Sequence, residues 1–471
     1  MRVLLKVSSA LALLFAMALP ATILTASAQS GGPYTSGFQL QNLSATTANV
    51  SIAYFQQSGV QQTSVTDSIL GFQSHTYFPL SAVSSGFNGS VVVSSDQPMA
   101  SIVNVLKSDA HGAAAYAGFT AGATTVNMPL IMRLNASSIS TWFTVQNTGT
   151  SAAHITAKYS GHTPACDQTA TIQPSASTTL DQSTNSCLPA GYVGAGTITS
   201  DQPVAVVVMQ IVNGSESLLA YTGFATASNF PVMPLVSSNF FHSGTGIQIQ
   251  NTGGTDTNVT ISYSPSAGFP GHACTETKTV AHGQSATFGF PQLPAACGQT
   301  SGTGVTDNVN GGFVGSGVVT GNTASQPLDA IVNQITRGAS SGDAYDAINV
   351  SSATSNVSMP LMMDRNPAGP TIKLFTGFAV ANVGTSTTNV ACTFTPGAGK
   401  PAGPPNIPSF PLAPGKSAAF VQLNAGTAGF VGSAICTATG GDAKIVAIVN
   451  ENAQGTVGTD DLIETYPGIN Y

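Results

Sequence analysis

Apolar and polar residues alternate along most of the chain, and one such pattern recurs four times. The clearest copy spans residues 191–213, where alternating residues reach a turn cluster at Ser200–Pro203 and a β-branched run follows. Alternation, a turn cluster and an apolar run together predict a β-hairpin, and proline favours the break because it lacks a ladder donor. Related segments begin at Gly86, Gly312 and Gly429. Four copies predict four repeated units.

A second recurring segment is a short alternating run that ends on asparagine, at Asn42, Asn147, Asn251 and Asn382. Asparagine suits a turn because its side chain can bond its own backbone. The asparagines lie 105, 104 and 131 residues apart. Regular spacing of this length indicates tandem whole domains rather than short solenoid repeats.

Seven residues after each asparagine comes a third pattern, a period-two run with an aromatic residue at the same place in every copy. The runs are 49–54, 154–159, 258–263 and 389–394. Alternation with an aromatic residue predicts a half-buried strand. Turn chemistry follows, as in Pro414-Gly415, and no segment has sustained helical periodicity. We therefore expect an all-β protein with six or seven strands in each unit.

The VxIxY strand followed by an LxPGxS turn, as at 259–263 and 412–417, resembles tandem Ig-like, fibronectin-like modules of bacterial secreted and cell-surface proteins. The resemblance covers residues 33–471 and implies four β-sandwich domains. Such modules serve in adhesion, as spacers and in stalks. The chain departs from antibody-type domains because its single tryptophan, Trp142, does not lie between paired cysteines. A β-propeller with two blades per repeat is the alternative fold.

Met-Pro-Leu recurs at 128–130, 233–235 and 359–361, and a central proline fits a domain junction or an edge strand that starts the next unit. These segments divide the chain into predicted domains 29–130, 131–235, 236–361 and 362–471.

Residues 1–28 have the features of a secretory signal peptide. Arg2 and Lys6 precede an apolar stretch, and Ala26-Ser27-Ala28 fits the cleavage site. No later apolar run reaches the roughly 18 residues of a membrane helix. We expect an exported protein, located outside the cell or at its surface.

Charged residues make up only 7% of the chain. Without Arg2 and Lys6, 10 basic residues face 19 acidic ones, a net charge near −9. Nucleic acids and anionic membranes bind clustered Lys and Arg, so neither is an expected partner. With 42% apolar residues in strand patterns, the chain does not resemble a disordered one.

The six cysteines suggest disulfides, because the count is even and the chain is predicted to be exported. They are Cys166, Cys187, Cys274, Cys297, Cys392 and Cys436. Equivalent positions in successive repeats favour the pairs 166/187 and 274/297, and leave 392/436 as a bridge that would cross the last domain.

Candidate catalytic and metal-binding residues are few. The string G-x-S-x-G at 338–342 lacks the helix that a nucleophile elbow needs. His162 and His272 precede cysteines, but a zinc site needs about four ligands. Segment 307–311, Asp343 and Asp346 could offer oxygen ligands to calcium without the spacing of a known loop. We therefore predict no catalytic residues, metal or cofactor.

Two further groups of side chains bear on function. Tyr116, Tyr221 and Tyr345 recur in polar stretches and, if exposed, would stack on sugars, whereas Asp460, Asp461 and Glu464 suggest a solvated acidic tail.

Because a catalytic site would single out one copy, the leading hypothesis is a non-enzymatic structural or adhesive protein of the cell surface or extracellular matrix. The alternatives are an array of carbohydrate-binding modules and a subunit that self-associates into a filament through exposed edge strands. The sequence does not identify the surface polymer, glycan or protein that would be bound.

Overall fold

The computed structural model describes residues 34–107, 112–136, 138–212, 217–307, 309–323, 326–336, 341–368, 372–454 and 463–471. Within these ranges the chain forms strands, turns and two single-turn 3₁₀ segments, Ala295–Cys297 and Val350–Ser352, and no α-helix. The all-β prediction is confirmed. No helix in the described ranges could cross a membrane. The predicted signal peptide, 1–28, lies outside them.

The strands fall into four consecutive units. The first contains β1 (Tyr34–Asn42), β2 (Ala48–Gln56), β3 (Gln61–Ile69), β4 (Ser74–Tyr77), β5 (Gly89–Ser95), β6 (Met99–Lys107) and β7 (Ala113–Ala117). The second contains β8 (Ala123–Arg133), β9 (Ile139–Asn147), β10 (Ala153–Tyr159), β11 (Gln168–Ile172), β12 (Ser177–Asp181), β13 (Tyr192–Val212) and β14 (Leu218–Thr222).

The other two units repeat this order with short additions. The third contains β15 (Pro231–Phe240), β16 (Ser243–Asn251), β17 (Thr257–Pro265), β18 (Cys274–Val280), β19 (Ser285–Phe288), β20 (Phe313–Thr320), β21 (Leu328–Thr336), β22 (Gly342–Asp346) and β23 (Ile348–Asn349). The fourth contains β24 (Asn356–Asp364), β25 (Asn366–Pro367), β26 (Lys373–Asn382), β27 (Thr388–Pro396), β28 (Ile407–Leu412), β29 (Ser417–Val421), β30 (Phe430–Thr439), β31 (Ile445–Gln454), β32 (Glu464–Pro467) and β33 (Ile469–Asn470).

The first and fourth units each have two antiparallel sheets, whereas the strands of the second and of the third unit each form one continuous antiparallel sheet. In the first unit, an inner layer of order β4-β1-β6-β7 faces an outer layer of order β3-β2-β5. Phe38 and Val103 of the inner layer pack with Val50 and Val91 of the outer layer in one apolar core. The alternating burial of β2 follows directly from its period-two sequence. The predicted half-buried strands are therefore confirmed as β2, β10, β17 and β27.

The predicted hairpins are wrong. In the second unit, β13 is one strand whose first half pairs with β8 and β10 and whose second half pairs with β9 and β14. In the first unit, β5 pairs with β2 whereas β6 pairs with β1. The Ser-Asp-Gln-Pro break therefore carries the chain from one layer to the other. At this corner Asp96 accepts a hydrogen bond of 2.8 Å from the Asn49 backbone, and Asp201 accepts one of 2.7 Å from the His154 backbone.

The recurring asparagines close the first turn of every unit, as predicted. The Asn147 side chain donates to the carbonyls of Ser151 and Ile172, and its Oδ1 accepts from the Gly149 amide. Asn42, Asn251 and Asn382 make the equivalent bonds in their own units. One buried side chain thus holds the turn and the neighbouring strand end together.

The Met-Pro-Leu segments lie in β8, β15 and β24, the first strands of the second, third and fourth units, which pair with β13, β20 and β30 of the same units. The predicted boundaries at 130, 235 and 361 therefore fall inside strands, a few residues after the point where each new unit begins.

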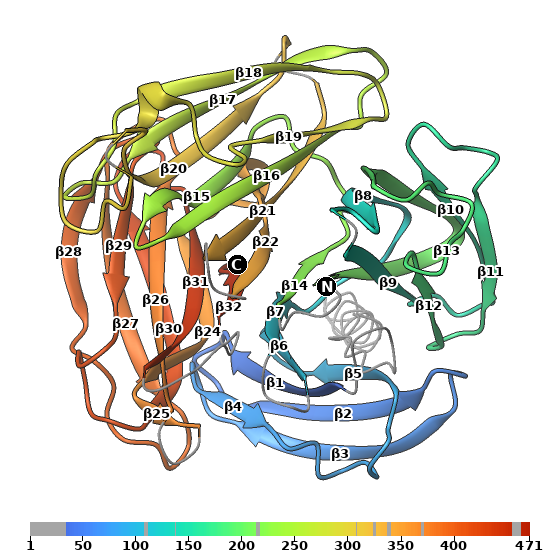
Figure 1. The fold of residues 1–471 in the computed structure, drawn as a ribbon. Helices are drawn as coiled ribbons and strands as arrows, with labels where there is room; N and C mark the ends of the chain where they lie inside the picture. The colour runs from blue at the N-terminus through green and yellow to red at the C-terminus, as the bar shows by residue number, and fades with distance from the viewer. Residues whose placement is uncertain are drawn as a thin grey trace, which may run out of the picture.

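The four units form a closed ring (Figure 1). The central strands β7, β14, β22 and β32, one from each unit, pack against one another around a common axis, and β32 returns to β7. A serine at equivalent places donates to a turn carbonyl of the next unit at three of the four seams: Ser90 to Ser175, Ser316 to Gly415 and Ser433 to Phe72. The last of these bonds joins the fourth unit to the first, and we call this contact the closing seam.

Asp343 lies at the centre of the ring. Its carboxylate accepts backbone N–H groups from Ala115 on β7 (3.1 Å), Ala220 on β14 (3.0 Å), Ala344 on β22 (2.7 Å) and Thr465 on β32. One fully buried side chain thus binds all four central strands. The proposed calcium ligand is instead the hydrogen-bond acceptor that joins the four units.

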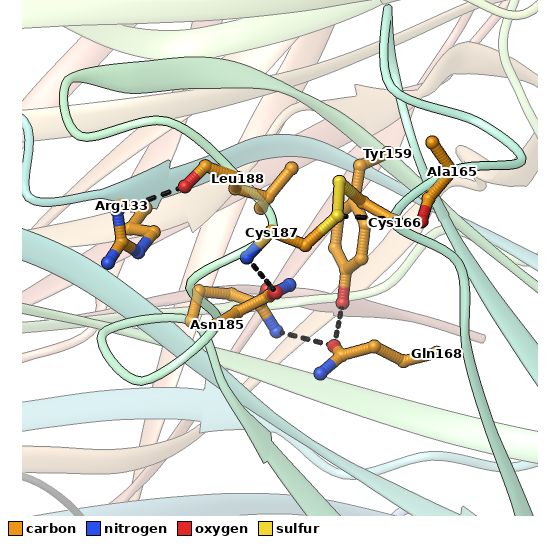
Figure 2. Close-up of a disulfide and its surroundings, with 9 residues drawn as sticks. Arg133, Tyr159, Ala165, Cys166, Gln168, Asn185, Cys187 and Leu188 are labelled. Carbon is orange, nitrogen blue, oxygen red and sulfur yellow. Dashed lines mark hydrogen bonds between the residues drawn. A yellow bond between two sulfur atoms is a disulfide. The ribbon is translucent and has the colours of Figure 1, made fainter.

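The structure contains three disulfides: Cys166–Cys187, Cys274–Cys297 and Cys392–Cys436. Figure 2 shows the first, which ties two loops of the second unit beside Tyr159 and Gln168. Cys392 lies directly opposite Cys436 on the paired strands β27 and β30. This bridge therefore joins neighbouring strands of one sheet, and the expectation that it crosses the domain is wrong.

Tyr116, Tyr221 and Tyr345 are buried, so they cannot stack on sugars in the way the sequence suggested. Each belongs to a central strand. The hydroxyl of Tyr221 donates to the Leu130 carbonyl (2.6 Å) and accepts from the Leu130 amide (3.3 Å). Tyr466 makes the same pair of bonds with Leu361. Tyr345 donates to the Leu235 carbonyl, so Tyr221, Tyr345 and Tyr466 fasten the central strands of the second, third and fourth units to the Met-Pro-Leu strand of the same unit.

Replacing Tyr221 by phenylalanine is expected to lower the free energy of unfolding by about 2–3 kcal/mol, because the buried amide and carbonyl of Leu130 both lose their partner. Urea denaturation measures the change. Tyr263→Phe is the matched control, since its hydroxyl meets the single carboxylate of Glu276 at 3.1 Å. If both variants lost the same small amount of unfolding free energy, the role given to Tyr221 would be contradicted.

Candidate functional site

The closing seam contains a cavity of about 900 Å³. Strands β1, β4 and β6 of the first unit line one side, and strands β24, β26, β31 and β32 of the fourth unit line the other. Its walls include the apolar side chains of Phe38, Leu361, Met363 and Leu374. A cavity of this size, with apolar walls and a few polar groups, has the dimensions of a small-molecule site.

A hydrogen-bonded group from the first unit forms one polar edge. Asp67 Oδ2 accepts from His75 Nδ1 at 2.8 Å and from the Tyr77 hydroxyl at 2.6 Å. Burial raises the pKa of Asp67, but the bonds from Tyr77 and His75 outweigh it and hold the pKa below its ordinary value. Burial, together with Asp67, raises the pKa of Tyr77. The edge therefore presents an ionised carboxylate whose hydroxyl partner remains protonated.

Gln39 connects the two sides of the cavity. Its amide donates to Ser74 Oγ at 2.8 Å and to the Pro360 carbonyl of β24 at 3.1 Å, and its oxygen accepts from Thr76. Since Pro360 belongs to the fourth unit, this side chain fixes the spacing of the seam.

Phe78 forms an exposed part of the wall. Its side chain follows β4, lines the cavity and is 52% exposed. Tyr77 beside it stacks on Phe38 with ring centroids 4.6 Å apart, so the neighbouring backbone is held firmly. An exposed aromatic ring beside fixed polar groups can contact the apolar face of a ligand.

A pair of carboxyl groups forms the inner end of the cavity. Asn104 of β6 donates to Glu451 Oε2 at 3.1 Å and to Glu464 Oε2 at 2.7 Å. Burial raises the pKa of Glu464 to about 7, and burial with the adjacent Glu464 raises the pKa of Glu451 well above its ordinary value. The two side chains, Glu451 and Glu464, are 1% and 6% exposed. The prediction that Glu464 belongs to a solvated tail is wrong; Asp460 and Asp461 lie outside the described residues.

The other residues singled out from the sequence lie elsewhere and do not converge. His162 packs edge-on against Tyr192, and the backbone amide of His272 donates to the backbone carbonyl of Cys297. Asp307 accepts from the amides of Val309 and Asn310 within its own turn. In the described part of the chain no three His, Cys, Asp or Glu side chains are placed to hold a metal ion. Residues 338–340 of the G-x-S-x-G string lie outside the described ranges.

Asp346, the second proposed calcium ligand, is also buried. Its carboxylate accepts from the Thr222 amide at 3.0 Å and from the Thr222 hydroxyl. Burial raises the pKa of Asp346 to about 7. It joins the second unit to the third.

Sequence reasoning missed Asp67, His75, Asn104 and Glu451. A signal for Glu451 was present: it occupies the place that Gln210 and Gln334 hold in the second and third repeats. Aligning the recurring strands residue by residue would have found this exchange.

Comparison of the sequence with models of protein families gives no match, and comparison with curated proteins gives no relative.

Proposed function

We propose that this chain is an exported, non-enzymatic adhesive protein that holds a saccharide in the cavity of the closing seam. The observation that carries the proposal is the cavity itself, which combines the exposed ring of Phe78 with fixed polar groups from two units. A sugar ring offers apolar C–H faces to an aromatic ring and hydroxyl groups to carboxylate and amide side chains. The ionised carboxylate of Asp67 is an acceptor for such hydroxyl groups.

Export and an Ig-like sandwich for each unit form part of the proposal. Three disulfides are typical of proteins in oxidising compartments. Two facing layers that share one core, as in the first unit, support sandwich units rather than propeller blades.

The contact between the fourth and first units weighs against a linear stalk. It also weighs against a filament in which chains associate through their first and last units. Both models need first and last units that are available to other chains, whereas here they bind each other. A ring that presents the cavity of the closing seam suits adhesion better.

Phe78→Ala is expected to weaken saccharide binding about tenfold, because an aromatic contact contributes about 1 kcal/mol beyond the area it buries. A glycan array identifies the bound sugar, and titration calorimetry on that sugar measures the change. Phe290→Ala is the matched control, since Phe290 is also an exposed phenylalanine before a cis proline but belongs to the third unit. No retention on any glycan, or equal losses in both variants, would refute the proposal.

A further inference from the structure

The four seams differ at one recurring pair of positions. Between the second and third units, Gln210 and Asn333 exchange two hydrogen bonds of 2.9 and 2.7 Å. Between the third and fourth units, Gln334 and Asn450 do the same at 3.2 and 3.1 Å. Between the first and second, Val105 takes the place of the glutamine, and it is buried in one apolar cluster with residues of the second unit. Two seams are thus joined by neutral amides and one by apolar contact.

At the closing seam the glutamine position is occupied by Glu451, and β32 adds a second carboxyl group, Glu464. The asparagine remains as Asn104 and donates one N–H to each carboxyl group. The remaining oxygen of each, Oε1, is buried without a hydrogen-bond partner among the described residues. Glu451 and Glu464 are register partners on the paired strands β31 and β32. Two buried carboxylates placed side by side cannot both stay ionised, so a proton shared between them is the simplest way to satisfy these oxygens.

The charged groups around this pair do not neutralise it. Asp343 on β22 acts on the pKa of Glu451 in the same direction as Glu464 does, and both raise it. Tyr466 follows on β32 with a raised pKa and stays neutral.

Across the cavity, Asp67 and His75 are bonded to each other. Lys107 and Lys400 also line it, and Lys400 is exposed to solvent. Protonation is therefore the means by which the closing seam avoids two buried negative charges.

We propose that Glu451, Glu464 and Asn104 form a proton-dependent latch that holds the fourth unit against the first. The inference rests on the proposed function only where it assigns the adjoining cavity to a ligand. The latch itself is tested on ligand-free protein. With the proton present, the carboxyl pair and Asn104 match the amide pairs of the other seams. Without the proton, Glu451 and Glu464 both carry a negative charge. These charges repel each other across two neighbouring strands of the fourth unit, at its contact with the first unit.

The direction of the effect follows from the raised pKa values. A carboxyl group whose pKa is higher in the folded ring contributes stability that is complete below its ordinary range, near pH 4.5, and is lost as the pH rises through about 7. The latch is therefore closed in acid and weakens between about pH 5 and pH 8.

Thermal unfolding of ligand-free protein across pH 5–8 tests the latch, with Glu451→Gln as the main variant. This change places a glutamine amide at the closing seam, as Gln334 does at the seam between the third and fourth units. We expect the Tm of the unmodified protein to fall by a few degrees more than that of Glu451→Gln over this range. Buried acids outside the seam, such as Asp346, titrate in both proteins and cancel in the comparison.

Gln334→Glu is the reciprocal variant, since Gln334 is 7% exposed and faces Asn450. It should bring a new loss of Tm with rising pH to the seam between the third and fourth units. Hydrogen exchange at pH 8 should be faster in β6 and β31 of the unmodified protein than in Glu451→Gln.

Parallel curves of Tm against pH for the unmodified protein and Glu451→Gln would overturn the latch. Identical hydrogen-exchange rates in β6 and β31 of the two proteins would overturn it as well. If Glu451→Gln does not fold, Glu464→Gln removes the same charge pair and is judged by the same comparison. Neither result bears on saccharide binding, so loss of the latch and loss of the proposed function are distinguishable.

Discussion

Asp343→Ala is expected to destabilise the ring by about 5 kcal/mol or more. The substitution leaves four buried backbone N–H groups facing an empty centre, and each unsatisfied buried donor costs about 1–3 kcal/mol. Such a loss is comparable with the whole stability of many folded proteins. Urea denaturation measures it, and light scattering reports whether the four units still form one compact particle.

The chemistry of Asp343 makes this site unusually intolerant of conservative change. Burial raises the pKa of Asp343 well above its ordinary value, whereas the four N–H bonds act to lower it. All four of these partners are donors, so the carboxylate form satisfies them and a carboxyl proton would have no acceptor among them. In Asp343→Asn the new amide N–H₂ would point towards two of these donors, so this variant should also be strongly destabilised.

Two comparisons make the expectation specific. Asp256→Ala removes an exposed carboxylate that accepts one amide, from His282 at 2.9 Å, and should cost less than about 1 kcal/mol. Added formate should raise the stability of Asp343→Ala by filling the vacated position, since a ligand that binds only the folded state stabilises it. An unfolding midpoint for Asp343→Ala equal to that of Asp256→Ala would show that Asp343 does not join the units.

Replacing Cys392 and Cys436 together by alanine is expected to lower the free energy of unfolding by about 4 kcal/mol. The bridge closes a loop with a sequence separation of 44 residues, and the chain-entropy relation gives a larger effect for longer loops. Both sulfurs are buried in the fourth unit, where β27 and β30 pair, so the same positions also lose apolar contacts.

The double variant of Cys166 and Cys187 is the internal control. Its loop has a separation of 21 residues, for which the same relation gives about 3 kcal/mol. Cys187 is also exposed, so less packing is lost. Urea denaturation of both variants should rank the buried bridge as the more stabilising; the reverse order would mean that loop length and burial do not set the difference.

Local features of this protein were predictable because they depend on neighbours in sequence. Period-two alternation placed β2, β10, β17 and β27, and the recurring asparagines marked turns that their own side chains close. Cysteines at equivalent places in repeats indicated disulfides. The hairpin prediction failed because alternation reveals that two strands follow each other, not whether they pair. The same Asp-Gln-Pro break serves a hairpin or a passage between two layers.

The candidate site as a whole could not be predicted because its parts are brought together by ring closure. Repeat alignment marks Glu451 as an exchange for glutamine, but it does not show that Asp67, far away in the chain, lies across the same cavity. The neighbours of Tyr221 in sequence, such as Thr222 and Gly223, do not show whether its side chain is buried. Only the packing of four central strands shows that this stretch lies at the axis and is buried.

The sequence by itself determined that the chain is all-β and repeated four times, since side-chain alternation and turn residues act within a few residues of each other. The tertiary structure decided that the repeats close into a ring, that Asp343 binds all four central strands and that a carboxyl pair lies at the closing seam. Those outcomes depend on hydrogen bonds and burial between residues more than a hundred positions apart, and local sequence carries no record of such distances.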